Sequence, residues 1–229
     1  IIYEETNDKN ISEYFNKLGN LISDYLNKAG YDYCKGNIMA KNPKWCQSAE
    51  VWKGYFSKWI KSAEPQDLLD IKIFFDFRLI YGKQDIVDNL SNHIKIELEN
   101  RPQFFVFMAQ NTLKSKPPVN IFGNFSLQSS GEKAETFNIK EAILPIVDFT
   151  RLYSLKYNIE STNTIGRLNR LYDKKKLHKE VYNEIIQAYK YLMQVRLKNQ
   201  IKLISNNKKP NNLIEPKKLT SLEKSMIKK

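Results

Sequence analysis

The residues of this sequence that are best placed to do chemistry are a carboxylate and a guanidinium inside an apolar run. Asp76 and Arg78 stand two positions apart in the run IKIFFDFRL, which covers residues 71–79. In an extended strand such residues project from the same face, and a carboxylate there is costly to bury unless it is paired or faces a cleft. Two interpretations follow: an ion pair that is only structural, or an Asp76 that binds a metal ion in an active-site cleft.

The sequence argues against several other kinds of site. It contains no G-x-x-x-x-G-K-[ST], G-x-G-x-x-G or G-x-S-x-G motif. The only histidines, His93 and His178, lie far from each other and from the cysteines, which argues against a nucleophile with its base and against structural zinc. We interpret Cys34 and Cys46 as reduced thiols, although their spacing also permits a disulfide.

The net charge of +12 comes from the last third of the chain. Residues 1–150 contain 18 Lys and Arg and 19 Asp and Glu, a balance of −1, whereas residues 151–229 contain 19 and 6, a balance of +13. This excess indicates either a polyanion-binding surface or lysines that are only solvated on helix faces. Lysine dominates over arginine, and aromatic residues do not alternate with basic ones, so we favour solvated lysines and expect no nucleic-acid partner.

Apolar periodicity predicts a mainly helical chain with a few strands. The clearest predicted strand is 71–79, rich in Ile and Phe; a second strand followed by a loop is expected within 31–40, and a hairpin or long loop within 117–137. A capping box at Thr220 and Glu223 predicts one more helix start. The predicted helices cover residues 8–29, 48–60, 85–100, 102–114, 139–157, 164–172 and 178–204.

These elements predict a predominantly helical α+β fold in two domains, residues 1–82 and residues 83–229. With 8 Gly and 8 Pro the chain is poor in turn residues, which argues against an all-β fold. No apolar stretch approaches the roughly 18–20 residues that a membrane span needs, and no secretory signal opens the chain. We therefore expect a cytoplasmic protein that does not contact a membrane.

Short motifs in both predicted domains resemble one known family. This is the nucleotidyltransferase family found beside CBS and cyclic-nucleotide-binding domains in bacterial signalling proteins, related to the protein-PII uridylyltransferases. In the first domain the motifs are residues 30–40 (GYDYCKGNIMA), 42–45 (NPKW), Trp52, Phe56 and 74–78 (FFDFR). In the second they are residues 144–148 (LPIVD), Arg151, Thr164, Arg167, Leu168, 194–197 (QVRL), Pro216 and 219–223.

The resemblance implies that the chain is a piece of a larger protein. Members of the family carry a Gly-Ser pair and a Thr-Asp-x-Asp stretch just upstream of the position where this chain begins. Residues 1–4 resemble the continuation of the strand that holds those two aspartates. The expected architecture is a truncated nucleotidyltransferase-like α/β portion followed by a helical-bundle domain similar to substrate-binding domains. The missing strand would leave an exposed edge, which could pair in a homodimer.

The resemblance also assigns a catalytic role to Asp76. Nucleotidyl transfer uses divalent ions held by carboxylates, which activate the attacking oxygen and neutralise the phosphates. Asp76 matches the third metal carboxylate of the family, so we expect it to bind Mg²⁺ in the intact protein, with a nucleoside triphosphate as substrate. Arg78 would contact phosphate or hold Asp76 in place.

Further residues are expected to bind substrate. The loop of Lys35, Gly36 and Asn37 suits contact with a nucleotide or substrate, although a simple β-turn accounts for the last two equally well. Arg167 would line a cleft between the two domains or only cap the helical bundle. Asp148 and Arg151, three positions apart on a predicted helix, are better explained as a structural pair.

The expected activity of the intact protein is metal-dependent transfer of a nucleoside monophosphate to a protein or small-molecule acceptor. Adjoining CBS or cyclic-nucleotide-binding domains would regulate it. The chain alone should be inactive, because it lacks a Gly-Ser pair and an Asp-x-Asp motif. One alternative is a regulatory or interaction module without catalysis, and another is polyanion binding by the basic last third.

Overall fold

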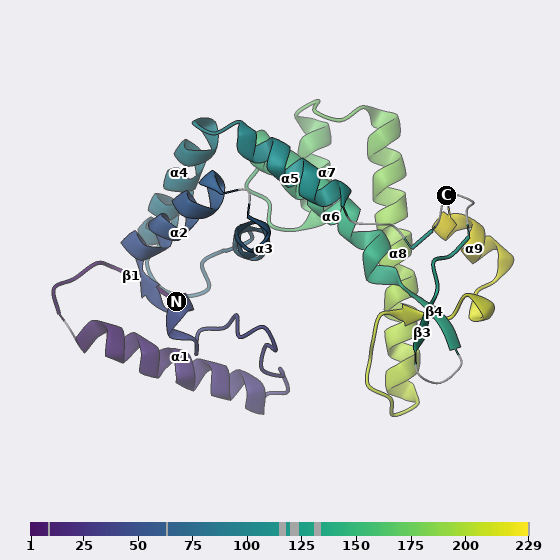
Figure 1. The fold of residues 1–229 in the computed structure, drawn as a ribbon, viewed down its shortest axis with the longest axis horizontal. Coiled ribbons are helices and arrows are strands. Elements are labelled where there is room, and N and C mark those ends of the chain that lie inside the picture. The colour runs from purple at the N-terminus through teal and green to yellow at the C-terminus, as the bar shows by residue number, and fades with distance from the viewer. Residues whose placement is uncertain (9, 63, 115–117, 120–123, 131–133, 229) are drawn as a thin grey trace. The chain divides into compact units, whose positions relative to one another are not determined.

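The computed structural model describes residues 1–228 apart from residues 9, 63, 115–117, 120–123 and 131–133. The chain divides into two compact units, Ile1–Phe104 (unit 1) and Phe105–Lys229 (unit 2). Both are mainly helical with short strands (Figure 1), so the predominantly helical α+β prediction is confirmed. None of the helices in the described ranges has the length and apolar content needed to cross a membrane.

Unit 1 is built from helices around a two-stranded parallel sheet. Ile2 pairs with Gln47 and Tyr3 with Ser48, so the expected strand at the start of the chain is confirmed. Helix α4 packs on α2 and belongs to unit 1, whereas the sequence predicts a domain boundary between residues 82 and 83. The elements are β1 (Ile2–Tyr3), α1 (Asn10–Lys28), the 3-10 helix η1 (Pro43–Trp45), β2 (Gln47–Ser48), α2 (Ala49–Lys61), α3 (Pro65–Phe74), α4 (Gln84–Glu99) and α5 (Gln103–Leu113), which continues into unit 2.

The strand prediction for residues 71–79 is wrong. Residues up to Phe74 belong to helix α3, and Asp76 and Arg78 follow it in a turn and a loop. The helical period explains the burial, because Leu68, Ile71 and Phe75 share one face and are 4%, 0% and 8% exposed. The aromatic and β-branched composition concealed this period.

The strand expected within residues 31–40 is also wrong, since the described residues there form turns without a strand. The backbone N–H of Asn37 donates to the carbonyl of Cys34 at 2.9 Å, and Asn37 has a φ of 54°. Asn tolerates this left-handed conformation better than most residues. Turn formation therefore prevails over the β propensity of the two tyrosines.

Unit 2 combines most of α5 and the helices α6, α7, α8 and α9 with a small antiparallel sheet. Strand β4 lies between β3 and β5, so the described part of residues 117–137 confirms the predicted hairpin. The predicted capping box is confirmed as well: Glu223 Oε2 accepts from the Thr220 N–H at 2.9 Å, and Thr220 Oγ1 accepts from the Glu223 N–H at 3.2 Å. The elements are β3 (Gln128–Ser130), β4 (Ala134–Asn138), α6 (Ile139–Lys156), α7 (Thr164–Asp173), α8 (Lys179–Ser205), β5 (Leu213–Ile214), the 3-10 helix η2 (Pro216–Lys218) and α9 (Ser221–Lys228).

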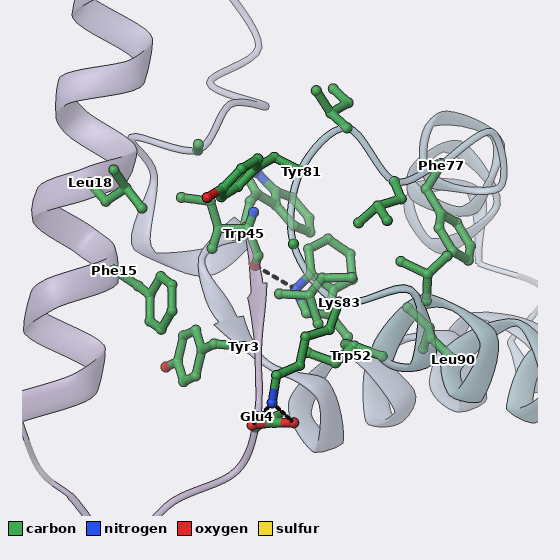
Figure 2. Close-up of a pocket in the computed structure, with 18 of the residues that line it drawn as sticks. Tyr3, Glu4, Phe15, Leu18, Trp45, Trp52, Phe77, Tyr81, Lys83 and Leu90 are labelled. Atoms are coloured by element: carbon green, nitrogen blue, oxygen red, sulfur yellow. Dashed lines mark hydrogen bonds and ion pairs between the residues drawn. The ribbon is translucent and has the colours of Figure 1, made fainter.

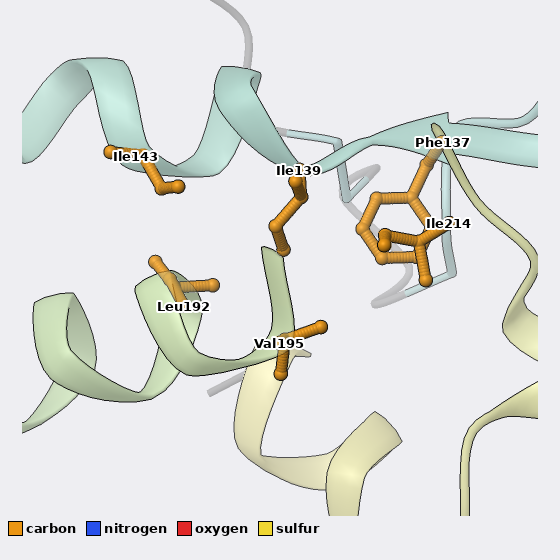
Figure 3. Close-up of a cluster of buried hydrophobic side chains, with 6 residues drawn as sticks. All are labelled: Phe137, Ile139, Ile143, Leu192, Val195 and Ile214. Atoms are coloured by element: carbon orange, nitrogen blue, oxygen red, sulfur yellow. The ribbon is translucent and has the colours of Figure 1, made fainter. Parts of the chain in front are cut away.

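One core of unit 2 joins its sheet to two of its helices (Figure 3). Phe137 and Ile139 are fully buried at the junction of β4 and α6. Side chains of α8 and β5 pack against them, which fixes α6 on α8 and on the sheet. The cluster consists of Phe137, Ile139, Ile143, Leu192, Val195 and Ile214.

Helices α6 and α7 pack together and bury an unusual number of polar groups. Arg151 Nη1 lies 3.2 Å from Asp148 Oδ1, with both side chains almost buried, so the predicted pair is confirmed. Thr150 is fully buried and its hydroxyl donates to the Val147 carbonyl at 3.0 Å. Arg167 on α7 is only 4% exposed. The Asp148–Arg151 pair and the Thr150 hydrogen bond both lie within α6, so they offset the cost of burying these polar groups in that helix.

Candidate functional site in unit 1

A cavity of about 1080 Å³ lies in unit 1. Six parts of unit 1 line it: the first residues of the chain, one side of α1, the loop and 3-10 helix before β2, one side of α2, the end of α3, and residues 77–90. Figure 2 shows Phe15 and Leu18 of α1 on one side and Phe77 and Leu90 on the other. Its volume is sufficient for a small-molecule ligand.

Aromatic rings form one wall of the cavity. The ring of Trp45 lies 4.5 Å from that of Phe74 and 6.0 Å from that of Trp52. Two caps position these rings: the Asn42 side chain accepts from the Lys44 N–H at 3.0 Å and begins η1, and Ser48 begins α2 by accepting from the Val51 N–H at 3.4 Å. Such a wall suits a ligand with a flat or apolar group.

The strand β1 is tied to this wall by hydrogen bonds. The indole N–H of Trp52 donates to the Ile1 carbonyl at 3.1 Å, and the N–H of Gln47 donates to the same oxygen at 3.2 Å. On the opposite side the ring of Tyr3 stacks on that of Phe15 at 4.8 Å and 1°. Strand β1 is therefore held between α1 and α2.

Charged groups also border the cavity. Lys83 Nζ donates to both carboxylate oxygens of Glu4, at 3.0 and 3.2 Å, and this hydrogen bond raises the pKa of the Lys83 amino group (Figure 2). Arg78 lines the same cavity and its side chain is exposed. The site can thus bind an apolar group in its interior and an anionic group at Arg78.

The structure brings only Arg78 of the predicted site residues to this cavity. Asp76, two positions earlier, lies in the turn after α3 and is not among the lining residues. Asn37 lines a smaller cavity of about 430 Å³, where its carbonyl accepts from the Asn42 side chain at 3.0 Å. Lys35 and Gly36 are exposed in the adjoining turn, and Arg167 belongs to unit 2.

Both cysteines are free thiols, as predicted. Cys34 is exposed, whereas Cys46 is fully buried beside the aromatic wall. Burial raises the pKa of the Cys46 thiol, which keeps it protonated and unreactive.

A polar cluster between α2 and α4 was not predicted from the sequence, because its members come from two helices. Ser57 of α2 lies with its hydroxyl 2.8 Å from His93 Nε2 and donates to Glu97 Oε1 at 3.1 Å. A hydroxyl has one proton, so Ser57 can donate to only one of these two partners, and which atom donates in the shorter bond depends on the tautomer of His93. The spacing of His93 and Glu97, four apart on α4, was the available signal.

Replacing Ser57 by Ala should lower the free energy of unfolding by about 1 kcal/mol, because two hydrogen bonds between α2 and α4 are lost. Chemical denaturation followed by far-ultraviolet circular dichroism measures this. The matched control is Ser91→Ala on the exposed side of α4, which should change stability by less than about 0.5 kcal/mol. Equal effects of the two variants would show that the Ser57 hydrogen bonds contribute nothing.

A complete metal site is not found in the described part of the chain. No group of three or more His, Cys, Asp or Glu side chains there could hold a metal ion. A carboxylate such as Asp76 is a suitable ligand for Mg²⁺, but one carboxylate does not make a site.

The fold and the cavity define a two-unit, predominantly helical α+β protein with a ligand-sized site in its first unit. The chain belongs to the family described as "Putative nucleotidyltransferase substrate binding domain", whose model matches residues 102–229, and residues 1–66 match the family described as "Putative nucleotidyltransferase DUF294". Asp76 and Arg78 lie between the two matched ranges. No curated protein and no solved structure matches the chain.

Proposed function

We propose that the chain works in the transfer of a nucleoside monophosphate from a nucleoside triphosphate to a protein or small-molecule acceptor. The observation that carries the proposal is the order of the two family matches, a nucleotidyltransferase range followed by its substrate-binding range. The wider context is part of the proposal: a cytoplasmic bacterial signalling protein in which CBS or cyclic-nucleotide-binding domains regulate a transferase related to the protein-PII uridylyltransferases.

Unit 1 would contribute charge and an aromatic wall to nucleotide binding. Arg78 borders the cavity with an exposed guanidinium, which is a good phosphate ligand. Trp45 and Trp52 line the same cavity but are only 5% and 4% exposed, so they would contribute apolar contact at its wall. The turn at Lys35 and Asn37 would act next to the smaller cavity.

Unit 2 would bind the acceptor. Its residues match a substrate-binding domain, and its paired helices α6 and α7 hold the buried Arg167 and the Asp148–Arg151 pair. Asp76 keeps its proposed role as a ligand of Mg²⁺, together with groups outside this chain. This role is based only on the motif of residues 74–78, because Asp76 lies in a turn and not in the strand predicted for residues 71–79.

A transfer assay tests the proposal. This chain, and the longer protein that we propose to contain it, are incubated with Mg²⁺ and nucleoside triphosphates labelled at the α-phosphate. We expect label on an acceptor only with the longer protein, and we expect Asp76→Asn to abolish it while Asp85→Asn, an exposed carboxylate of the same unit, does not. Transfer by this chain alone would contradict the expectation that it is inactive by itself.

Two other functions predict different results, the first in this transfer assay and the second in a binding measurement. A regulatory or interaction module would transfer no label from any triphosphate, even in the longer protein. The balance of +13 in residues 151–229 favours polyanion binding as a second candidate. In that case an anionic polymer should bind at low salt and lose affinity steeply at moderate salt, and no binding at low salt would exclude it.

A further inference from the structure

Helix α1 buries little of its own apolar side. The only buried residues of the helix are Gly19 and Ser23. A Cβ at Gly19 would lie 2.3 Å from the Ala40 carbonyl oxygen, so the helix contacts the loop at residue 40 through its smallest residue. Tyr14, Leu21 and Tyr25 are instead 60%, 49% and 59% exposed. This exposure is large for a helix that the sequence makes so clearly amphipathic.

The exposed Tyr14, Leu21 and Tyr25, together with the half-buried Ile11 and Leu18, follow the spacing of a helix–helix interface. Ile11, Tyr14, Leu18, Leu21 and Tyr25 are separated by three, four, three and four positions, the a and d positions of a heptad pattern. We call these five residues the α1 seam. Ile11, Tyr14 and Leu18 also line the cavity, so the seam runs along one wall of it. At 19 residues, α1 is about 28 Å long.

The charges of α1 identify the partner. The helix has four charged residues, Glu13, Lys17, Asp24 and Lys28, with no net charge. A second copy of α1 lying antiparallel, with its centre opposite Asn20, places Lys17 beside Asp24 of that copy, and the reciprocal pair forms by symmetry. An anionic surface or polymer would find no excess of positive charge here.

Lys17 and Asp24 already have partners within the chain, but these contacts are weak enough to be replaced by contacts with a second copy. Lys17 pairs with Glu13 of the same helix at 2.7 Å, and Asp24 pairs with Lys41 at 3.1 Å and accepts from the Tyr33 hydroxyl at 2.7 Å. All four side chains are exposed to solvent, at 76%, 65%, 45% and 41% for Lys17, Glu13, Asp24 and Lys41. Exposed pairs of this kind are weak, so burial of the seam can rearrange them.

We propose that this chain forms a homodimer through the α1 seam, with the two helices packed antiparallel. A symmetric arrangement covers the same residues on both copies, which closes the assembly at two. The dimer removes the exposed Tyr14, Leu21 and Tyr25 from water.

Sedimentation equilibrium of the purified chain tests this assembly. The chain should sediment as a dimer that dissociates on dilution. Leu21→Glu should weaken the dimer by at least about 100-fold, because it places a charge in the seam of each copy. The matched control is Leu197→Glu, since Leu197 of α8 is similarly exposed, at 57%, and lies in unit 2. Circular dichroism confirms that both variants remain folded.

Charge reversal provides a second test that does not alter the apolar seam. Lys17→Asp should weaken association by about tenfold, and adding Asp24→Lys should restore it. A monomeric wild-type chain at all concentrations would overturn the proposal. So would an assembly larger than a dimer, an unchanged dimer in Leu21→Glu, or equal weakening by Leu197→Glu.

Discussion

Replacing Trp45 by Ala should lower the free energy of unfolding of unit 1 by about 3–5 kcal/mol. The side chain is 5% exposed and lies at the centre of the aromatic wall, with four rings within 6.3 Å of its own. Lys44 Nζ lies 4.2 Å from the same ring and adds a cation–π contact. The backbone around Trp45 is fixed by η1, so the surrounding rings cannot easily move in to fill the space.

Hydrogen exchange with mass spectrometry measures the size and the place of this loss. Amide protection should fall in α2 and α3, whose side chains pack on Trp45. The control is Tyr81→Ala, because Tyr81 borders the same cavity with 97% of its side chain exposed. Tyr81→Ala should lower the free energy of unfolding by less than about 0.5 kcal/mol. A Trp45 variant as stable as the Tyr81 variant would contradict the packing described here.

The second large effect is expected in unit 2, where Phe137→Ala should lower the free energy of unfolding by about 3–5 kcal/mol. Phe137 is fully buried and its ring stacks on that of Phe125 at 4.6 Å. It is also the residue of β4 that pairs with Ile214 of β5. Its loss therefore opens a cavity at the point where the sheet meets α6 and α8.

The matching control for Phe137 is Leu222→Ala on α9, which is 71% exposed. Thermal unfolding by calorimetry gives the stability of each variant, and hydrogen exchange shows which amides lose protection. We expect faster exchange in β4, in β5 and in the part of α8 around Leu192. Loss of protection confined to residues 1–104 would show that Phe137 does not stabilise the unit in which it lies.

Helices with strong local signals could be predicted from the sequence, because the deciding interactions are local. Gly30 follows α1 with a φ of 98°, and Ser48, a good N-cap, begins α2. The capping box at Thr220 and Glu223 begins α9 as predicted. Such signals depend on residues within one turn of each other, which the sequence displays directly.

Helix α3 could not be predicted in the same way, because its burial pattern depends on other elements. Asp67 and Asp70 are 7% and 3% exposed, which sequence reasoning treats as unfavourable. Lys58 of α2 lies 3.4 Å from Asp67, and Lys44 of η1 lies 3.5 Å from Asp70. These lysines offset the cost of burying the two carboxylates. They belong to α2 and η1, so no pattern within α3 itself indicates that they pair with it.

The candidate site was predictable only in its single residues. Arg78 was identified from its position in an apolar run, and it does line the cavity. The cavity itself is formed by segments from Ile1 to Leu90 that no local pattern connects. The link between Ser57 and His93 spans 36 positions and depends on the packing of α2 on α4. Sequence patterns identify chemical groups more readily than they identify which groups meet.

The aromatic wall also gives the molecule an optical property. All three tryptophans of the chain, Trp45, Trp52 and Trp59, belong to unit 1, and residues 105–229 contain none. Intrinsic tryptophan emission therefore reports on unit 1 alone and shifts to longer wavelength when its rings meet water. Because Trp45 and Trp52 border the cavity, a molecule that enters it should quench or shift that emission without any attached dye.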